Sequence, residues 1–89
     1  MKSGLIIANW KCNKNLAEAK DWVSKFNPSF DPNLKTVVIC PPFTLLSELK
    51  SDLENRKLKI ELGAQNVSQF ENGEYTGEVN AAQIKDFAN

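Results

Sequence analysis

The sequence predicts an α/β domain in which parallel strands alternate with helices. Strand-like and helix-like segments follow one another in units of about 30 residues, the usual size of a βαβ unit. The first two strand-like segments are apolar and rich in β-branched residues, which is typical of strands buried on both faces. A helix after each strand favours right-handed crossovers and a parallel sheet.

The first unit has a strand at about 5–9 and a helix at about 16–26. The strand is an unbroken apolar run, so we expect both of its faces to be covered. Asn15 is a good N-cap, and Glu18 three residues later completes a capping box. Asn27-Pro28 ends the helix, because the residue before a proline disfavours the helical conformation.

The second unit has a strand at about 36–40 and a helix at about 45–55. Pro41-Pro42 ends the strand, since neither proline can donate a ladder hydrogen bond. Thr44 is the predicted N-cap of the helix. The helix buries a stripe of leucines at helical spacing, namely Leu46, Leu49 and Leu53.

The third unit has a strand at about 58–62, where apolar and charged residues alternate. A long loop at 63–79 follows, with no helix or strand pattern. Such a loop exceeds the usual two to six residues of a strand-to-helix connection and is more often functional than not. Asn80, with Gln83 three residues later, caps a last helix at about 81–88.

Composition indicates a single soluble domain. The chain has 89 residues, and its 11 basic residues balance 11 acidic residues, so it has no charge footprint for nucleic acid or anionic lipid. Its apolar runs are too short to span a membrane, and no signal peptide precedes the first strand. We therefore expect a cytoplasmic protein with neither a nucleic-acid nor a membrane partner.

The residues that usually hold metals are scarce. Cys12 and Cys40 make neither a disulfide framework nor a CxxC motif, and we expect both to be small buried residues near strand ends. The sequence contains no histidine, which excludes a histidine acid, base or metal ligand from these residues. We predict no metal and no cofactor.

Polar residues follow the first strand directly. Because side chains alternate along an extended chain, Asn9 and Lys11 should project the same way and Trp10 the opposite way. The carboxyl end of a buried parallel strand is where α/β proteins bind ligands. The alternative is a polar strand end that simply meets solvent. Three parallel strands also leave two edges and one open face, so the domain is expected to be part of a larger sheet.

Two separate motifs carry a resemblance to a known family. Residues 8–13, ANWKCN, resemble the opening signature of triosephosphate isomerase. Residues 63–68, GAQNVS, and residues 75–79, YTGEV, resemble that family's long third loop. The resemblance implies that 1–89 is the amino-terminal portion of a single TIM-barrel domain, the first three βα units of a (β/α)8 barrel.

The resemblance also implies an activity. Triosephosphate isomerase interconverts dihydroxyacetone phosphate and D-glyceraldehyde 3-phosphate in glycolysis and gluconeogenesis, through an enediolate and without a cofactor. It implies that Lys11 is catalytic and binds substrate, and that Asn9 binds substrate. The family's proton transfer uses a glutamate base beside a neutral histidine. We expect both to lie outside this chain, which should therefore be inactive alone.

Family members form homodimers in which the long loop docks against the other subunit. The resemblance places Cys12, Gln65, Tyr75, Thr76 and Glu78 at that interface. The implied partners are a triose phosphate, the remainder of the barrel and a second subunit. The alternative for the loop is an ordinary flexible segment that turns at Asn72-Gly73.

Two other functions are compatible with the sequence. The first is a non-catalytic barrel fragment that oligomerises or swaps through its exposed sheet edges and long loop. The second is a different phosphate-binding barrel enzyme, which would have no reason to carry the long loop. We expect the isolated chain not to behave as a simple monomer.

Overall fold

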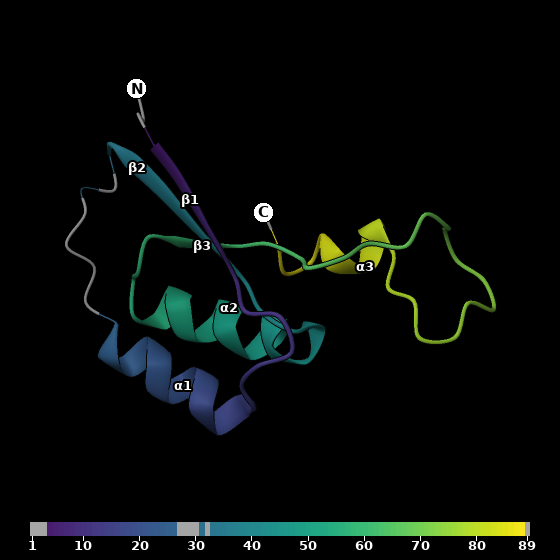
Figure 1. Cartoon of the computed structure of the whole chain (residues 1–89), viewed down its shortest axis with the longest axis horizontal. Coiled ribbons are helices and arrows are strands. Elements are labelled where there is room, and N and C mark those ends of the chain that lie inside the picture. Colours follow the sequence, from purple (N-terminus) through teal and green to yellow (C-terminus); the bar gives the residue numbers. More distant parts are fainter. Residues whose placement is uncertain (1–3, 27–30, 32, 89) are drawn as a thin grey trace.

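The computed structural model describes residues 4–26, 31 and 33–88. In this part of the chain, helices follow the strands of a three-stranded parallel sheet in the order β1-β2-β3 (Figure 1). The predicted α/β class of alternating parallel strands and helices is confirmed. The elements are β1 (Gly4–Asn9), α1 (Leu16–Lys25), β2 (Lys35–Cys40), the 3-10 helix η1 (Phe43–Leu45), α2 (Leu46–Asn55), β3 (Ile60–Leu62) and α3 (Ala81–Ile84).

The register brings the carboxyl ends of the three strands together at one end of the sheet. Asn9 at the end of β1 pairs with Cys40 at the end of β2. Ile39 of β2 pairs with Leu62 at the end of β3. The residues that follow the three strands are therefore neighbours, although they are far apart in the sequence.

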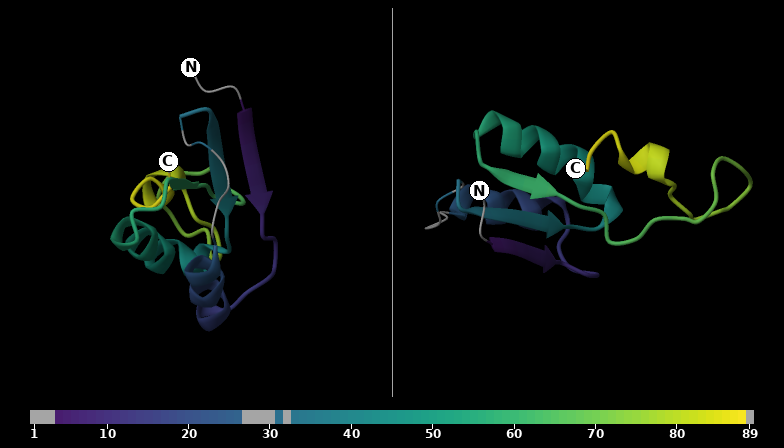
Figure 2. Two further views of the ribbon diagram at one scale, coloured as in Figure 1. Left: turned by 90° about the vertical axis from the view of Figure 1, so that its left-hand side faces the viewer. Right: turned by 90° about the horizontal axis from the view of Figure 1, so that it is seen from above.

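The core lies between the sheet and two helices. Helices α1 and α2 pack side by side on the same face of the sheet (Figures 1 and 2). The rings of Trp10, Trp22 and Phe26 contact one another in series at one side of this core. The buried apolar residues are Trp10, Ala19, Val23, Val37, Ile39, Leu45, Leu46, Leu49, Leu53, Ile60 and Leu62. The predicted leucine stripe of α2 is confirmed.

The expectation that β1 is covered on both faces is wrong for this chain. Leu5, Ile6 and Ile7 are 64%, 49% and 60% exposed. Strand β1 lies at the edge of the sheet, and α1 packs against α2 rather than against β1. Since Val37 and Ile39 of β2 are buried under the helices, the other face of the sheet is the uncovered one.

Helix α1 begins as predicted. The Asn15 side chain accepts a hydrogen bond from the Glu18 N–H at 2.9 Å, and the Glu18 carboxylate accepts one from the Asn15 N–H at 3.0 Å. The helix ends at Lys25 with Phe26 as its C-cap. The predicted stop at Asn27-Pro28 lies outside the described residues.

The prediction that Thr44 caps the second helix is wrong. Thr44 lies within η1, which precedes α2 and begins after Pro42. The Leu45 N–H donates to the Pro42 carbonyl at 3.0 Å, and the Leu46 N–H donates to the Phe43 carbonyl. A Thr44 cap would accept from the same Leu46 N–H, so the 3-10 turn already satisfies a group that the hydroxyl would bond. Helix α2 consequently starts at Leu46 without a side-chain cap.

The last strand and the last helix are shorter than predicted. Strand β3 starts at Ile60 rather than at about 58, because the Leu58 N–H donates to the Leu53 carbonyl at the end of α2, at 3.1 Å. Helix α3 ends at Ile84 rather than near 88. Beyond it, the Phe87 N–H turns back to the Ile84 carbonyl at 2.9 Å, and Phe87 packs against the core.

The long loop has a defined structure of its own. The Ser68 N–H donates to the Val79 carbonyl at 2.8 Å, which holds the two ends of the loop together. The residues between them project away from the sheet (Figure 1). Inside the loop, the rings of Phe70 and Tyr75 stack at 4.1 Å between centroids. The close approach of its ends makes residues 68–79 an Ω-loop, packed by its own side chains, rather than an irregular segment.

Candidate functional site

An open groove lies at the end of the sheet where the carboxyl ends of the three strands meet. Two of the side chains that line it, Lys11 and Lys14, are cationic, and none is a carboxylate. A groove with this charge favours an anionic ligand. The lining residues are Asn9, Lys11, Cys12, Asn13, Lys14, Pro42, Phe43, Gln65 and Asn66.

Asn9 presents its amide at the end of β1. Its Oδ1 accepts a hydrogen bond from the Lys11 N–H at 2.8 Å. Its Nδ2 makes no hydrogen bond within the part of the chain that the structure describes. The side chain is therefore oriented by its oxygen, and its two N–H donors remain available to a ligand in the groove.

Lys11 reaches the same groove, but not by strand alternation. Its φ is 56°, in the left-handed region, so the chain has already left the extended conformation. Its ammonium makes no ion pair with any described residue. Trp10 lies on the opposite side as expected: it is 9% exposed, and its ring meets that of Trp22 edge-on at 5.2 Å. Asn9 and Lys11 thus share one groove because of a local turn at Lys11.

The side chain of Gln65 bonds to the turn after β1 and to the last residue of β2. Its Nε2 donates to the Lys11 carbonyl at 2.9 Å and to the Cys40 carbonyl at 2.8 Å. Sequence reasoning placed Gln65 only at a subunit interface and missed this link. The signal that selected Asn9, a polar residue at the carboxyl end of a strand, also applies to Gln65, three residues after β3.

The two cysteines differ in environment. Cys12 lines the groove and is exposed, so the expectation that it is buried is wrong. It follows the turn at Lys11 and therefore lies outside the sheet. Cys40 is half-buried at the end of β2, with its sulfur facing the Gly63 backbone. Both are free thiols.

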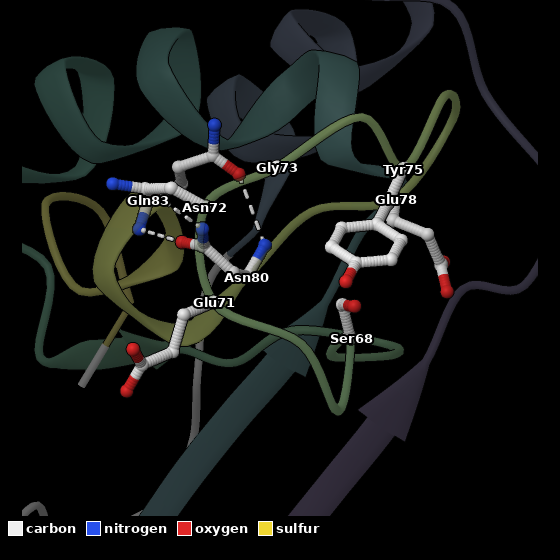
Figure 3. Close-up of a pocket in the computed structure, with 8 residues that line it drawn as sticks. All are labelled: Ser68, Glu71, Asn72, Gly73, Tyr75, Glu78, Asn80 and Gln83. Atoms are coloured by element: carbon white, nitrogen blue, oxygen red, sulfur yellow. Dashed lines mark hydrogen bonds between the residues drawn. The ribbon is translucent and has the colours of Figure 1, made fainter.

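The remaining predicted interface residues lie in the Ω-loop, not in the groove. Tyr75 and Glu78 line a second, smaller cavity (Figure 3). Thr76 is exposed. Asn80, which is 8% exposed, donates from Nδ2 to Asn72 Oδ1 at 3.1 Å and accepts from the Gln83 N–H at 3.0 Å. The polar groups at the centre of this cavity bond to one another, which indicates loop structure rather than a ligand site.

The described residues contain neither a metal-ligand cluster nor a membrane-spanning helix. No three of their histidine, cysteine, aspartate and glutamate side chains are grouped closely enough to hold a metal ion. Each helix in the described ranges is too short or too polar to cross a lipid bilayer.

Comparison with known proteins gives one consistent family. The family model of triosephosphate isomerase matches residues 4–89. The triosephosphate isomerase of Alkaliphilus oremlandii (strain OhILAs) is 42% identical over 86 residues, which cover 97% of this chain and 34% of that protein. The corresponding protein of Alkaliphilus metalliredigens (strain QYMF) is 40% identical over 86 residues, which again cover 97% of this chain and 34% of that protein. That of Polynucleobacter necessarius (strain STIR1) is 36% identical over 98% of this chain and 36% of its own length.

The chain therefore spans about a third of the length of the curated relatives that it matches. Its parallel strands and their helices are consistent with the first βα units of a TIM barrel.

Proposed function

The chain belongs to the triosephosphate isomerase family, and we propose that it supplies the first strands of a site that interconverts dihydroxyacetone phosphate and D-glyceraldehyde 3-phosphate. In this role it binds the substrate and stabilises charge. Proton transfer belongs to residues outside this chain, since the 89 residues contain no histidine and the family uses a histidine beside a glutamate base.

The observation that carries the proposal is the pairing of Asn9 and Lys11 in one groove. Isomerisation through an enediolate places negative charge on a substrate oxygen beside a phosphate dianion. The Lys11 ammonium would offset this charge, and the Asn9 amide would donate a hydrogen bond near the same oxygen. Groups held in place before reaction stabilise such charge without reorganising. Lys11 is the proposed catalytic and substrate-binding residue, and Asn9 the second substrate-binding residue.

We further propose two protein partners. The uncovered face and edge of β1, with Leu5 and Ile7 exposed, suit the remainder of a barrel. The Ω-loop suits a second subunit, with Cys12, Tyr75, Thr76 and Glu78 as interface residues. Gln65 remains an interface candidate through its oxygen, because its nitrogen is engaged within the chain. A role in glycolysis would place the protein in the cytoplasm.

A chimera tests the proposed function directly. Residues 4–89 replace the matching segment of the Alkaliphilus metalliredigens enzyme, and turnover of glyceraldehyde 3-phosphate is measured. We expect isomerase activity, and a loss of roughly 10²–10³-fold in kcat for Lys11→Ala, the usual cost of removing one charge-stabilising group. The matched control is Lys59→Ala, which removes an equal positive charge from an exposed residue just before β3 and should leave activity unchanged.

An inactive but folded chimera, or equal activity in Lys11→Ala and Lys59→Ala, contradicts the proposed function. The 89-residue chain measured alone should show no turnover. Turnover by that chain, free of full-length enzyme, would contradict the assignment of proton transfer to other residues.

A second candidate function is a non-catalytic assembly module. The exposed apolar strand β1 favours it, because a bare edge strand with apolar faces is a template for pairing with another chain. The two functions differ in the chimera. A module has no need of the Lys11 ammonium, whereas an isomerase site does.

A further inference from the structure

The side chain of Gln65, which follows β3, connects the segment after β1 to the last residue of β2. Its amide nitrogen donates to the Lys11 carbonyl at 2.9 Å and to the Cys40 carbonyl at 2.8 Å, across 54 and 25 residues of sequence. A side-chain amide nitrogen carries two N–H groups. Both are therefore used to join backbone carbonyls of the groove wall, and none of this capacity remains for a ligand.

The Cys40 carbonyl is itself held by the sheet. It also accepts the Trp10 N–H at 3.1 Å, just beyond the β1–β2 ladder. Trp10 itself is buried in the core. Gln65 thereby fixes the Lys11 carbonyl relative to the end of the β1–β2 ladder.

Lys11 is held at both of its peptide groups. Its N–H donates to Asn9 Oδ1 at 2.8 Å, and its carbonyl accepts from Gln65. Between these two bonds, Lys11 adopts a φ of 56°, which residues with a side chain rarely adopt. The direction of its Cα–Cβ bond, and so the position of its ammonium, depends on keeping that φ. Loss of the Gln65 bond would release the carbonyl side and allow the backbone to relax.

We propose that Gln65 is a positioning residue for Lys11, acting through the Lys11 backbone without touching substrate. This inference rests on the proposed function, in which the Lys11 ammonium binds substrate and stabilises charge. Asn9 orients one side of Lys11 and Gln65 the other. These two bonds to the Lys11 backbone together fix the position of the Lys11 ammonium.

The isomerase chimera provides the test. Gln65→Met keeps the length of the side chain and removes both donors, while Glu54→Met replaces a polar side chain of the same length at an exposed position of α2. We expect Gln65→Met to lower kcat/KM by roughly 10–100-fold, the scale of loss that a displacement of about 1 Å causes in an active site. Glu54→Met should leave kcat/KM unchanged, and equal values for the two variants would overturn the inference.

A double-mutant cycle separates positioning from a merely structural role. If Gln65 acts through Lys11, then Gln65→Met should have little further effect on kcat/KM when Lys11→Ala is already present. A full and independent loss in both backgrounds would contradict the proposal. A variant that only reduces the folded fraction lowers the circular dichroism signal and kcat together but leaves KM unchanged.

A second variant covers the case in which Gln65→Met does not fold. Gln65→Asn keeps the amide but is one methylene shorter, so it cannot reach both carbonyls. It should also lower kcat/KM, and an unchanged value would overturn the inference. An inactive chimera with all native residues contradicts the proposed function itself. An active chimera that loses activity with Lys11→Ala, but not with either Gln65 variant, contradicts this inference alone.

Discussion

Gly63 lies so close to Cys40 that a Cβ atom on Gly63 would be 2.8 Å from the Cys40 sulfur. The same atom would be 3.2 Å from Val38 Cγ1. We therefore expect Gly63→Ala to destabilise the fold by about 1–3 kcal/mol, the usual cost of overpacking. The measurement is the thermal unfolding midpoint of the chimera, which should fall by roughly 2–4 °C per kcal/mol.

Gly4→Ala is the matched control for this prediction. A Cβ on Gly4 would meet only the Lys35 side chain, at 3.4 Å, which is an ordinary contact. Its effect on stability should stay within about 0.5 kcal/mol. Cys40→Ala combined with Gly63→Ala should recover part of the loss, because it removes the sulfur. Equal midpoints for the two glycine variants would contradict the close approach.

The buried cap of α3 should matter more than the exposed cap of α1. Asn15 and Asn80 both form capping boxes, but Asn80 also bonds to Asn72 of the Ω-loop at 3.1 Å. Asn15→Ala should cost about 0.5–2 kcal/mol, as for an ordinary N-cap. Asn80→Ala should cost more, because it removes a buried side chain together with its bond to the Ω-loop. Amide exchange should rise at residues 69–79 only in Asn80→Ala. Unchanged exchange there would show that Asn80 does not hold the loop.

The stacked rings of Phe70 and Tyr75 should set the order of the Ω-loop. Tyr75→Ala removes a ring pair worth about 0.5–1.5 kcal/mol beyond its buried area. We expect limited proteolysis to cut within the loop several-fold faster, while the melting midpoint of the sheet changes little. Gln69→Ala, an exposed change in the same loop, is the control. Equal cleavage rates in the two variants would count against the stack as the source of order.

Local chemistry made much of this fold predictable from the sequence. The capping boxes at Asn15 and Asn80 each depend on two residues three positions apart, and both are present. The alternation of strands and helices follows from the apolar runs and the helical leucine spacing. Thr44 failed as a cap because the preceding prolines allow a 3-10 turn to satisfy the same backbone groups. Residue preferences alone cannot decide whether a helix starts with a side-chain cap or with a 3-10 turn.

The site was only partly predictable for a different reason. Asn9 and Lys11 are only two residues apart in the sequence, so their common location could be anticipated, although the cause is the left-handed turn at Lys11 rather than strand alternation. The link from Gln65 to Lys11 joins residues 54 positions apart. Such a bond exists only once the sheet has formed, and no local pattern encodes it. The exposure of β1 likewise reflects which elements pack on it, not the apolar character of the strand.

The uncovered face of β1 should control association of the 89-residue chain. Leu5 and Ile7 are 64% and 60% exposed and, two residues apart, lie on the same face of an edge strand. The chain alone should therefore form oligomers, and the double change Leu5→Lys and Ile7→Lys should shift it to a monomer, because charges on an edge strand oppose pairing. Val67→Lys, at a residue 52% exposed in the long loop, adds a charge away from the sheet and should leave the oligomers intact. Light scattering after size exclusion gives the mass of each variant. A monomeric unmodified chain, or equal masses for all variants, would show that β1 does not drive association and would remove the support for the assembly module.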